Sequence, residues 1–214
     1  MPEQSRQPRR NASDIVAPYL TATKVLVGIN VVVFFLMLIT AREITDSVME
    51  KWGALVLPEM SVTHAWYRLV TAMFLHFDLP HLLNNMLLLL LLGETLERKL
   101  GPVRIVMVYL LGGLIGNVAS YVYYISEGYD VISAGASGAV FAFVGGMVVV
   151  TLRAHGRYEY VSFKRLGIMI LLSLYMGFVS SGVNNVAHVA GLLGGALVTF
   201  ILDGKYDILP AGKR

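Results

Sequence analysis

The stretch IVMVYLLGGLIGNVASYVYYI, residues 105–125, is 21 residues long and contains no charged side chain. A helix of about 20 apolar residues crosses the hydrocarbon core of a bilayer, and it satisfies its backbone hydrogen bonds internally. Five further apolar runs flank this one, at residues 25–41, 82–92 (extendable to 81–100), 134–152, 166–183 and 186–202. The sequence therefore predicts an all-α, polytopic membrane protein with six transmembrane helices.

The composition of the 214 residues agrees with this prediction. Hydrophobic residues make up 56% of the chain and charged residues only 14%, and the mean hydropathy is +0.67. An ordinary soluble domain carries about 25% charged residues, so a nucleic-acid-binding module, a disordered chain and a soluble enzyme are excluded. The chain has no cysteine, which excludes disulfides, thiolate catalysis and cysteine-bound metals.

Basic residues predict the orientation in the membrane. With six crossings, 14 of the 17 Lys and Arg residues fall on the side of both termini and 3 on the other side. Positive charge collects on the cytoplasmic side. We therefore expect a polar cytoplasmic tail at 1–23, which lacks the features of a signal peptide, a membrane domain at 24–203 and a cytoplasmic tail at 204–214. This minimal plan favours a prokaryotic cell membrane.

One connection, residues 42–80 between the first two predicted helices, is unusually long. Loops of this length are uncommon unless they have structure of their own. The connection contains five aromatic residues of the kind found at membrane surfaces, Trp52, Trp66, Tyr67, Phe74 and Phe77. We expect it to lie in the interface on the outer side.

Three of the predicted helices begin with a polar cluster. These clusters are His81-Leu-Leu-Asn84-Asn85, Gly135-Ala136-Ser137-Gly138 and Asn184-Asn185-Val-Ala-His188. Polar groups in a membrane span are costly and indicate function. The three helices run in the same direction, so the clusters are expected at similar depth near the outer face.

The residue types in these clusters indicate acyl-transfer chemistry. Serine becomes a nucleophile when a histidine takes its proton, and Ser137 and His188 form such a pair. The helices contain no carboxylate to complete a triad, so we expect a Ser–His dyad. His81 and Asn85, four residues apart on one helix face, and the Ser137 N–H are candidate donors to an oxyanion.

Small residues on two of the helices would bring this pair together. Gly138, Ala142 and Gly145 recur on one face of the fourth helix, and Gly191 and Gly195 share a face with His188. Small residues permit close helix approach. We expect valine at Gly191 or Gly195 to separate the helices, and alanine to be milder.

Structural explanations compete with each of these assignments. A Gly-Ala-Ser-Gly run alone is more often a helix contact, and a single buried histidine is often only a polar contact. The third alternative, a metal site at His76 and His81, is disfavoured because their spacing across Pro80 fits no helical ligand pair. Four polar residues at one depth favour the catalytic interpretation, with no metal or cofactor.

At this point the sequence resembles the rhomboid family of intramembrane serine proteases over about residues 60–203. The motifs that carry the resemblance are Tyr67-Arg68, His81-x-x-x-Asn85-Met86, Gly93-x-x-x-Glu97-x-x-x-Gly101, Gly135-Ala136-Ser137-Gly138 and Ala187-His188-x-x-Gly191-x-x-x-Gly195. Each motif is moderately specific, but five in order across six spans are a strong match.

The resemblance implies a role for each matching residue. Ser137 would be the nucleophile, His188 the base, and Asn85 and His81 would support the oxyanion. Arg68 and Glu97 would be structural. The sequence departs from the family at two positions: Phe141 stands where a tyrosine often stacks on the catalytic histidine, and Asn184 stands where an aspartate is frequent. Neither removes a catalytic group.

We therefore expect an intramembrane serine endopeptidase that cuts single-span membrane proteins near the outer face. Its partners would be transmembrane substrates and the lipid bilayer, without nucleic acid or metal; the sequence leaves its oligomeric state open. Two alternative functions make different demands on the sequence. A catalytically inactive relative that binds client helices should lack Ser137 or His188, and a transporter should carry charged residues deep in several spans.

Overall fold

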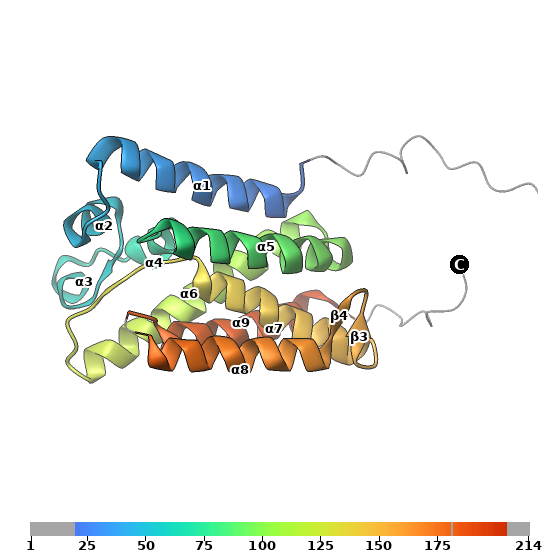
Figure 1. Cartoon of the computed structure of the whole chain (residues 1–214). Coiled ribbons are helices and arrows are strands. Elements are labelled where there is room, and N and C mark those ends of the chain that lie inside the picture. The colour runs from blue at the N-terminus through green and yellow to red at the C-terminus, as the bar shows by residue number, and fades with distance from the viewer. Residues whose placement is uncertain (1–19, 181, 205–214) are drawn as a thin grey trace, which may run out of the picture.

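The computed structural model describes residues 20–180 and 182–204. Most of the two predicted tails therefore lies outside the described residues. Six helices of 17 or more residues are present, namely α1 (Ala22–Ala41), α5 (Leu79–Leu100), α6 (Pro102–Ser126), α7 (Ser137–Arg153), α8 (Phe163–Val179) and α9 (Asn185–Leu202). They lie side by side as a bundle, with α1 at one edge and α8 at the other (Figure 1).

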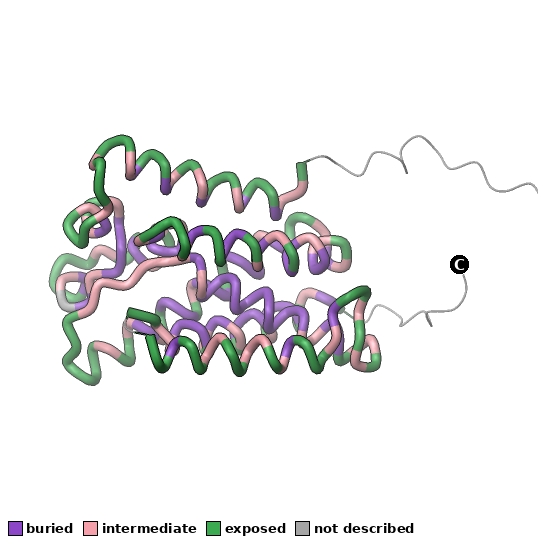
Figure 2. The backbone as a smooth tube through the Cα atoms, viewed as in Figure 1, coloured by how far each residue is buried: buried purple, intermediate pink, exposed green. Residues whose placement is uncertain are grey.

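The helix α7 forms the centre of the bundle. All ten residues from 138 to 147 are buried, and α5, α6, α8 and α9 all pack against it. Figure 2 shows this helix as a nearly continuous buried segment, whereas the peripheral helices α1 and α8 are exposed along one side. The core therefore surrounds the helix that begins with Ser137.

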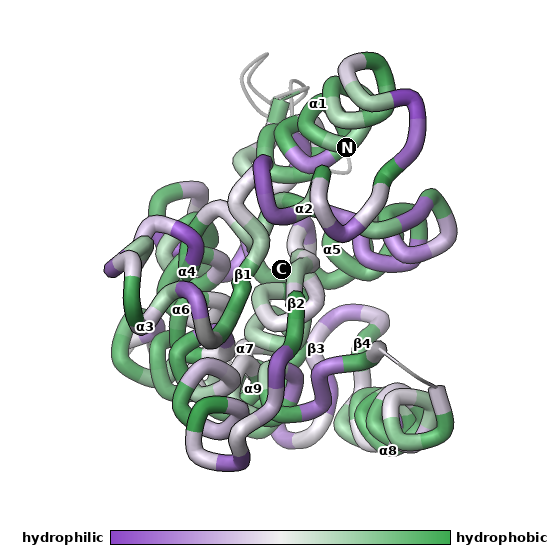
Figure 3. Tube along the Cα trace, turned by 90° about the vertical axis from the view of Figure 1, so that its left-hand side faces the viewer, coloured by the Kyte–Doolittle hydropathy of each residue, from purple (hydrophilic) through white to green (hydrophobic). Residues whose placement is uncertain are grey.

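The outer surface of the bundle is apolar. Ile39 on α1 is 75% exposed and Phe178 on α8 is 80% exposed, as are many other large hydrophobic side chains. The end-on view in Figure 3 shows the long helices coloured as predominantly hydrophobic, including α8 at the periphery. A surface of this kind suits lipid and not water.

Four of the helices, α1, α5, α6 and α9, are long and apolar enough to cross a membrane, and α7 is apolar but shorter. The chain is thus an integral membrane protein. The further prediction that six helices cross stays a prediction. The helices α5, α7 and α9 all begin at the same end of the bundle, and α1 begins at the end where α9 finishes (Figure 1).

Residues between α1 and α5 fold into short elements in place of an open loop. These are α2 (Asp46–Trp52), β1 (Leu55–Val56), α3 (Leu57–Thr63), α4 (Arg68–Thr71) and the 3-10 helix η2 (Ala72–Phe74). The Arg68 side chain is buried and donates hydrogen bonds to the carbonyls of Glu50 at 2.8 Å and Ala54 at 2.7 Å. These contacts agree with the structural role expected for Arg68.

Two small antiparallel strand pairs add to the predicted all-α fold. The strand β1 pairs with β2 (Ile132–Ser133), which leads into α7, and β3 (Arg157–Tyr158) pairs with β4 (Val161–Ser162), which leads into α8. Both pairs are two residues long, too short to show a periodic pattern in the sequence. They fix the chain just before a helix begins.

At the end of the bundle opposite Ser137, ion pairs join three helices. The Asp203 carboxylate, 4% exposed at the end of α9, lies 2.6 Å from Arg153 at the end of α7 and 3.5 Å from Lys99 at the end of α5. A buried carboxylate is tolerated only when it is paired in this way. This cluster joins the last turns of the three helices whose first turns carry the polar clusters.

Glu97 joins α5 to the first turn of α1. Its carboxylate accepts hydrogen bonds from the Ala22 and Thr23 amides, both at 2.8 Å, and from the Thr23 hydroxyl at 2.6 Å. The first N–H groups of a helix have no partner within the helix, and a negative charge there is favourable. The structural role expected for Glu97 agrees with these contacts.

We expect Glu97→Ala to destabilise the protein by about 2–4 kcal/mol, because it removes several hydrogen bonds to a charged acceptor. Thermal unfolding in detergent would measure the loss. Glu94→Gln is the matched control, because Glu94 makes a partly exposed ion pair with Lys24 worth about 1 kcal/mol or less. Equal stability of the two variants would contradict the capping role.

Candidate active site

Ser137 is the first residue of α7, and the backbone before it is held at two places. Ser133 pairs with Leu55 in the β1–β2 ladder, and the Gly135 amide donates to the Ala72 carbonyl at 2.9 Å. The N–H groups at the start of α7 lack partners within the helix. The serine hydroxyl therefore sits beside free amide donors on a fixed turn.

Gly135 brings His81 close to this serine. Its φ of +140° lies in the region that favours glycine. A Cβ at Gly135 would lie 2.8 Å from Cε1 of His81, and 3.7 Å from Oγ of Ser137. The imidazole of His81 and the hydroxyl of Ser137 thus border the same small space, which a side chain at Gly135 would fill.

His188, on the second turn of α9, faces the same side of α7. Its ring stacks on Phe141, with centroids 4.3 Å apart and planes at 8°. Phe141 lies four residues after Ser137 and so shares its helix face. The stacking expected from the resemblance is confirmed, and it is made by a phenylalanine ring.

No hydrogen bond joins Ser137 to His188 among those of the described residues, and the buried Nδ1 of His188 has no partner there. Catalytic hydrogen bonds are often long in the absence of substrate and tighten when it binds. Ser137 and His188 therefore lie at one face of α7, but they are not joined by a hydrogen bond in this structure.

The helices α7 and α9 pack so closely that their backbones are in contact at two glycines of α9. A Cβ on Gly191 would fall on the carbonyl oxygen of Gly138, and a Cβ on Gly195 would fall on the backbone of Ala142. The predicted small-residue contact is confirmed. The expectation that alanine is milder than valine at these positions stays a prediction, but alanine should also disturb the contact, because the obstacle to its Cβ is backbone, which cannot move aside.

Asn184 holds the start of α9. Its Oδ1 accepts from the Ala187 amide at 2.9 Å, and its Nδ2 donates to the hydroxyls of Ser120 and of Ser133, the latter at 3.0 Å. An amide can cap the helix and donate at the same time, whereas a carboxylate only accepts. The asparagine therefore links α9 to α6 and to the turn that carries Ser137.

Asn85 is buried on α5, one turn after His81. Its Nδ2 lies 3.1 Å from Nε2 of His76. His76 lies in the connection before α5 and is fully buried. Sequence reasoning considered it only as a metal ligand and missed this contact, which no spacing rule reveals. Asn84 is exposed, as expected for a residue about 100° around the helix.

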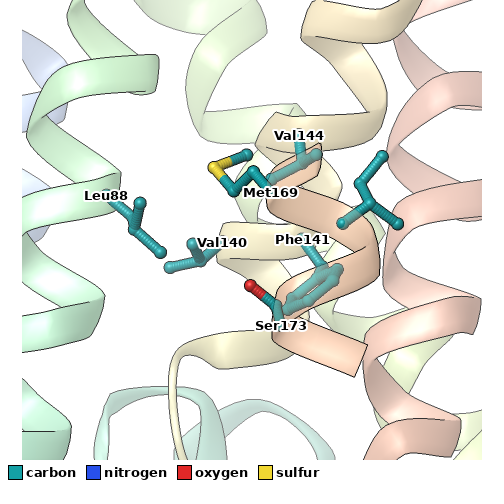
Figure 4. Close-up of a pocket in the computed structure, with 7 residues that line it drawn as sticks. Leu88, Val140, Phe141, Val144, Met169 and Ser173 are labelled. Atoms are coloured by element: carbon teal, nitrogen blue, oxygen red, sulfur yellow. The ribbon is translucent and has the colours of Figure 1, made fainter. Parts of the chain in front are cut away.

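The described residues contain no cluster of three or more His, Asp or Glu side chains placed to hold a metal ion. An apolar recess opens instead between α5, α7 and α8 (Figure 4). Its lining residues are Leu88, Val140, Phe141, Val144, Met169, Ile170 and Ser173. Phe141 lines this recess and also stacks on His188. An apolar group bound in the recess would therefore be separated from His188 by the ring of Phe141.

The fold and the site define an integral membrane protein with Ser137, His81, Asn85 and His188 gathered at one end of a helical bundle. Residues 63–205 match the family described as the Rhomboid domain. The chain belongs to the rhomboid family.

Three relatives are similar over much of the chain. YdcA of Bacillus subtilis (strain 168), named as a candidate rhomboid protease, is 35% identical over 66% of this chain and 70% of its own length. Rhomboid protease GluP of the same organism is 31% identical over 82% of this chain and 33% of its own. RHOMBOID-like protein 4 of Arabidopsis thaliana is 38% identical over 64% of this chain and 34% of its own. The matched part is thus about a third of the last two proteins.

We expect Gly191→Ala to lower both stability and activity, because its Cβ would force α9 away from α7. Overpacking costs about 1–3 kcal/mol, and a displacement of about 1 Å at a catalytic group can lower a rate by about 100-fold. Thermal unfolding and cleavage of a transmembrane substrate would be measured together.

Gly167→Ala in α8 is the control, because nothing lies within 4 Å of its Cβ position. It should be as stable and as active as the parent. A fully stable and fully active Gly191→Ala would mean that the α7–α9 contact does not determine the site.

Proposed function

We propose that this protein is an intramembrane serine endopeptidase that cleaves transmembrane segments near the outer face, with Ser137 as nucleophile and His188 as general base. The observation that carries the proposal is the stack of His188 on Phe141, one turn from Ser137. It brings His188 to the face of α7 on which Ser137 begins the helix. The relatives named as proteases support the same class of reaction.

In the proposed reaction His188 accepts the proton of the Ser137 hydroxyl while Oγ attacks the carbonyl carbon of the scissile peptide bond. A tetrahedral intermediate forms, and its collapse breaks the C–N bond as the imidazolium returns the proton to the leaving amine. Water, activated by His188, then hydrolyses the acyl-serine ester and restores the hydroxyl. No cofactor is consumed.

The negative charge that develops on the carbonyl oxygen needs donors already in place. The Ser137 amide, free at the start of α7, is one candidate. His81, which borders the same space across Gly135, and Asn85, one turn further along α5, are the others. Their positions on the rigid helices α5 and α7 support this role, since donors must not have to reorganise during the reaction.

The dyad would work without a carboxylate because other contacts orient the histidine. In a triad the aspartate holds the imidazole in its orientation and stabilises its charged form. Here the flat stack on Phe141 and the close packing of Gly191 on Gly138 restrict the ring and its helix. Orientation would thus come from packing.

The proposed topology has six membrane crossings with both termini in the cytoplasm of a prokaryotic cell. The division of basic residues, 14 against 3, supports it. The helices α7 and α8 would cross as 17-residue helices, near the lower limit of length for a span. The substrate would be a single transmembrane helix that unwinds near Ser137, since a helical peptide bond is shielded by its own hydrogen bonds.

The alternative is a catalytically inactive relative that binds client helices. The missing hydrogen bond between Ser137 and His188 favours it. The presence of both residues, with candidate oxyanion donors beside the serine, favours the enzyme. Covalent labelling by a fluorophosphonate probe separates the two, because only an activated serine reacts. Label mapped to Ser137 would exclude the inactive alternative.

Ser137→Ala should abolish both labelling and cleavage of a model transmembrane substrate, with unchanged thermal stability. His188→Ala should lose nearly as much, because residues that act as a unit are not additive. Ser180→Ala, in the cap after α8, is the control and should retain both activities. Proteolysis by purified Ser137→Ala protein would refute the assignment.

Asn85→Ala should lower kcat by about 100- to 1,000-fold, the usual effect of removing one oxyanion donor, and leave KM nearly unchanged. Asn84→Ala is the matched control, because this exposed neighbour points away from the site. Steady-state cleavage kinetics would measure both constants. An effect of Asn85→Ala on KM alone would remove the residue from the oxyanion site.

A further inference from the structure

His76 is the one fully buried histidine of the described residues, and the proposed reaction does not use it. It lies between η2 and α5, outside the long helices. Its Nδ1 has no hydrogen-bond partner among the described residues. Burying a polar ring without partners is costly. The contact of His76 with Asn85 is therefore the interaction that explains why a histidine is buried at this position.

That contact has one direction. Nδ2 of Asn85 lies 3.1 Å from Nε2 of His76, and an amide nitrogen only donates, so Nε2 accepts. Burial and the nearby His81 lower the pKa of His76 to about 3, which keeps the ring neutral at neutral pH and its acceptor available. One N–H of Asn85 is then fixed on His76, and the second N–H remains for another acceptor.

The same ring also contacts His81. The two imidazoles meet edge to face, with centroids 5.1 Å apart and planes at 68°. His81 and Asn85 lie on one face of α5, so His76 lies behind both side-chain candidates for the oxyanion site. A terminal amide can rotate to exchange its oxygen and nitrogen, and only the hydrogen-bond network decides between the two orientations.

We propose that His76 is a positioning residue: by accepting one N–H of Asn85, it holds the amide so that the other N–H points to the oxyanion. The proposal rests on the proposed function. His76 itself would touch neither the substrate nor the reacting atoms. Its effect would pass through Asn85 and would appear in kcat.

The test compares two substitutions at His76 in the full chain, by kcat and KM for a transmembrane substrate. His76→Gln keeps an acceptor at the same distance along the side chain as Nε2, whereas the amide of His76→Asn ends one bond short of it. We expect His76→Asn to lower kcat by about 10- to 100-fold, as for a misplaced catalytic group, with KM unchanged. His76→Gln should recover most of the rate.

His155→Gln, at an exposed histidine beyond α7, is the control and should leave both constants unchanged.

A double-mutant cycle with Asn85→Ala completes the test. If His76 acts through Asn85, His76→Asn should have almost no further effect on kcat in the Asn85→Ala background. The full effect in that background, or equal loss in the Gln and Asn variants, would overturn the proposal. Thermal unfolding of each variant identifies losses that come from folding, and His76→Gln provides the comparison if His76→Asn is unstable.

Failure of the proposed function would look different. It would appear as cleavage by Ser137→Ala, whatever happens at His76. Cleavage that depends on Ser137 but is insensitive to both His76 variants would overturn the positioning role alone.

Discussion

The backbone contact between α7 and α9 is the constraint on which the rest of the site depends. Lipid supplies no hydrophobic force between helices, so their association depends on close van der Waals packing. At Gly191 and Gly195 the helix α9 lies directly on the carbonyls of α7. Any wider separation would remove His188 from Phe141, and with it from the first turn of α7. In the proposed dyad, a glycine contact would thus position the histidine, as a carboxylate does in soluble serine proteases.

The two ends of the bundle are stabilised by different physics. At one end, Asp203 is neutralised by Arg153 and Lys99, in a closed set of ion pairs. At the other end several buried polar groups lack hydrogen-bond partners, among them Nδ1 of His188 and of His76. Unsatisfied buried groups cost free energy. At the Ser137 end, this cost accompanies the close packing of α9 on α7.

Much of the fold could be predicted from the sequence, since long apolar runs are unambiguous. The run at 105–125 lies within α6, which extends to Pro102 and Ser126. The apolar run predicts a helix from residue 134, three residues before α7 begins at Ser137, because Ala134 and Gly135 are as apolar and small as the helix that follows. Strand pairing and the φ of Gly135 exclude them from it. The short helices before α5 were missed because each spans only a few residues.

The site was predictable only in part. The residues Ser137, His188, His81 and Asn85 could be selected because polar groups are rare in apolar helices. The contact between His76 and Asn85 joins a turn to a helix through tertiary folding, so no periodicity signals it. The effect expected of alanine at Gly191 depends on the distance between two backbones, which the sequence does not contain.

The pairing of Glu97 with the amides of Ala22 and Thr23 has a consequence for biogenesis. The helix α1 is synthesised first, but its capping carboxylate lies about 75 residues later in the chain, in the second long helix. The local cap of α1 is Thr21, whose hydroxyl accepts from the Lys24 amide, but the Ala22 and Thr23 amides lack their carboxylate partner until α5 has been made. The region matched to the rhomboid family begins at residue 63, so a fragment cut to that boundary would leave a carboxylate at the membrane without the helix that it serves. The complete hydrogen bonding of the first turn of α1 thus depends on both of the first two long helices.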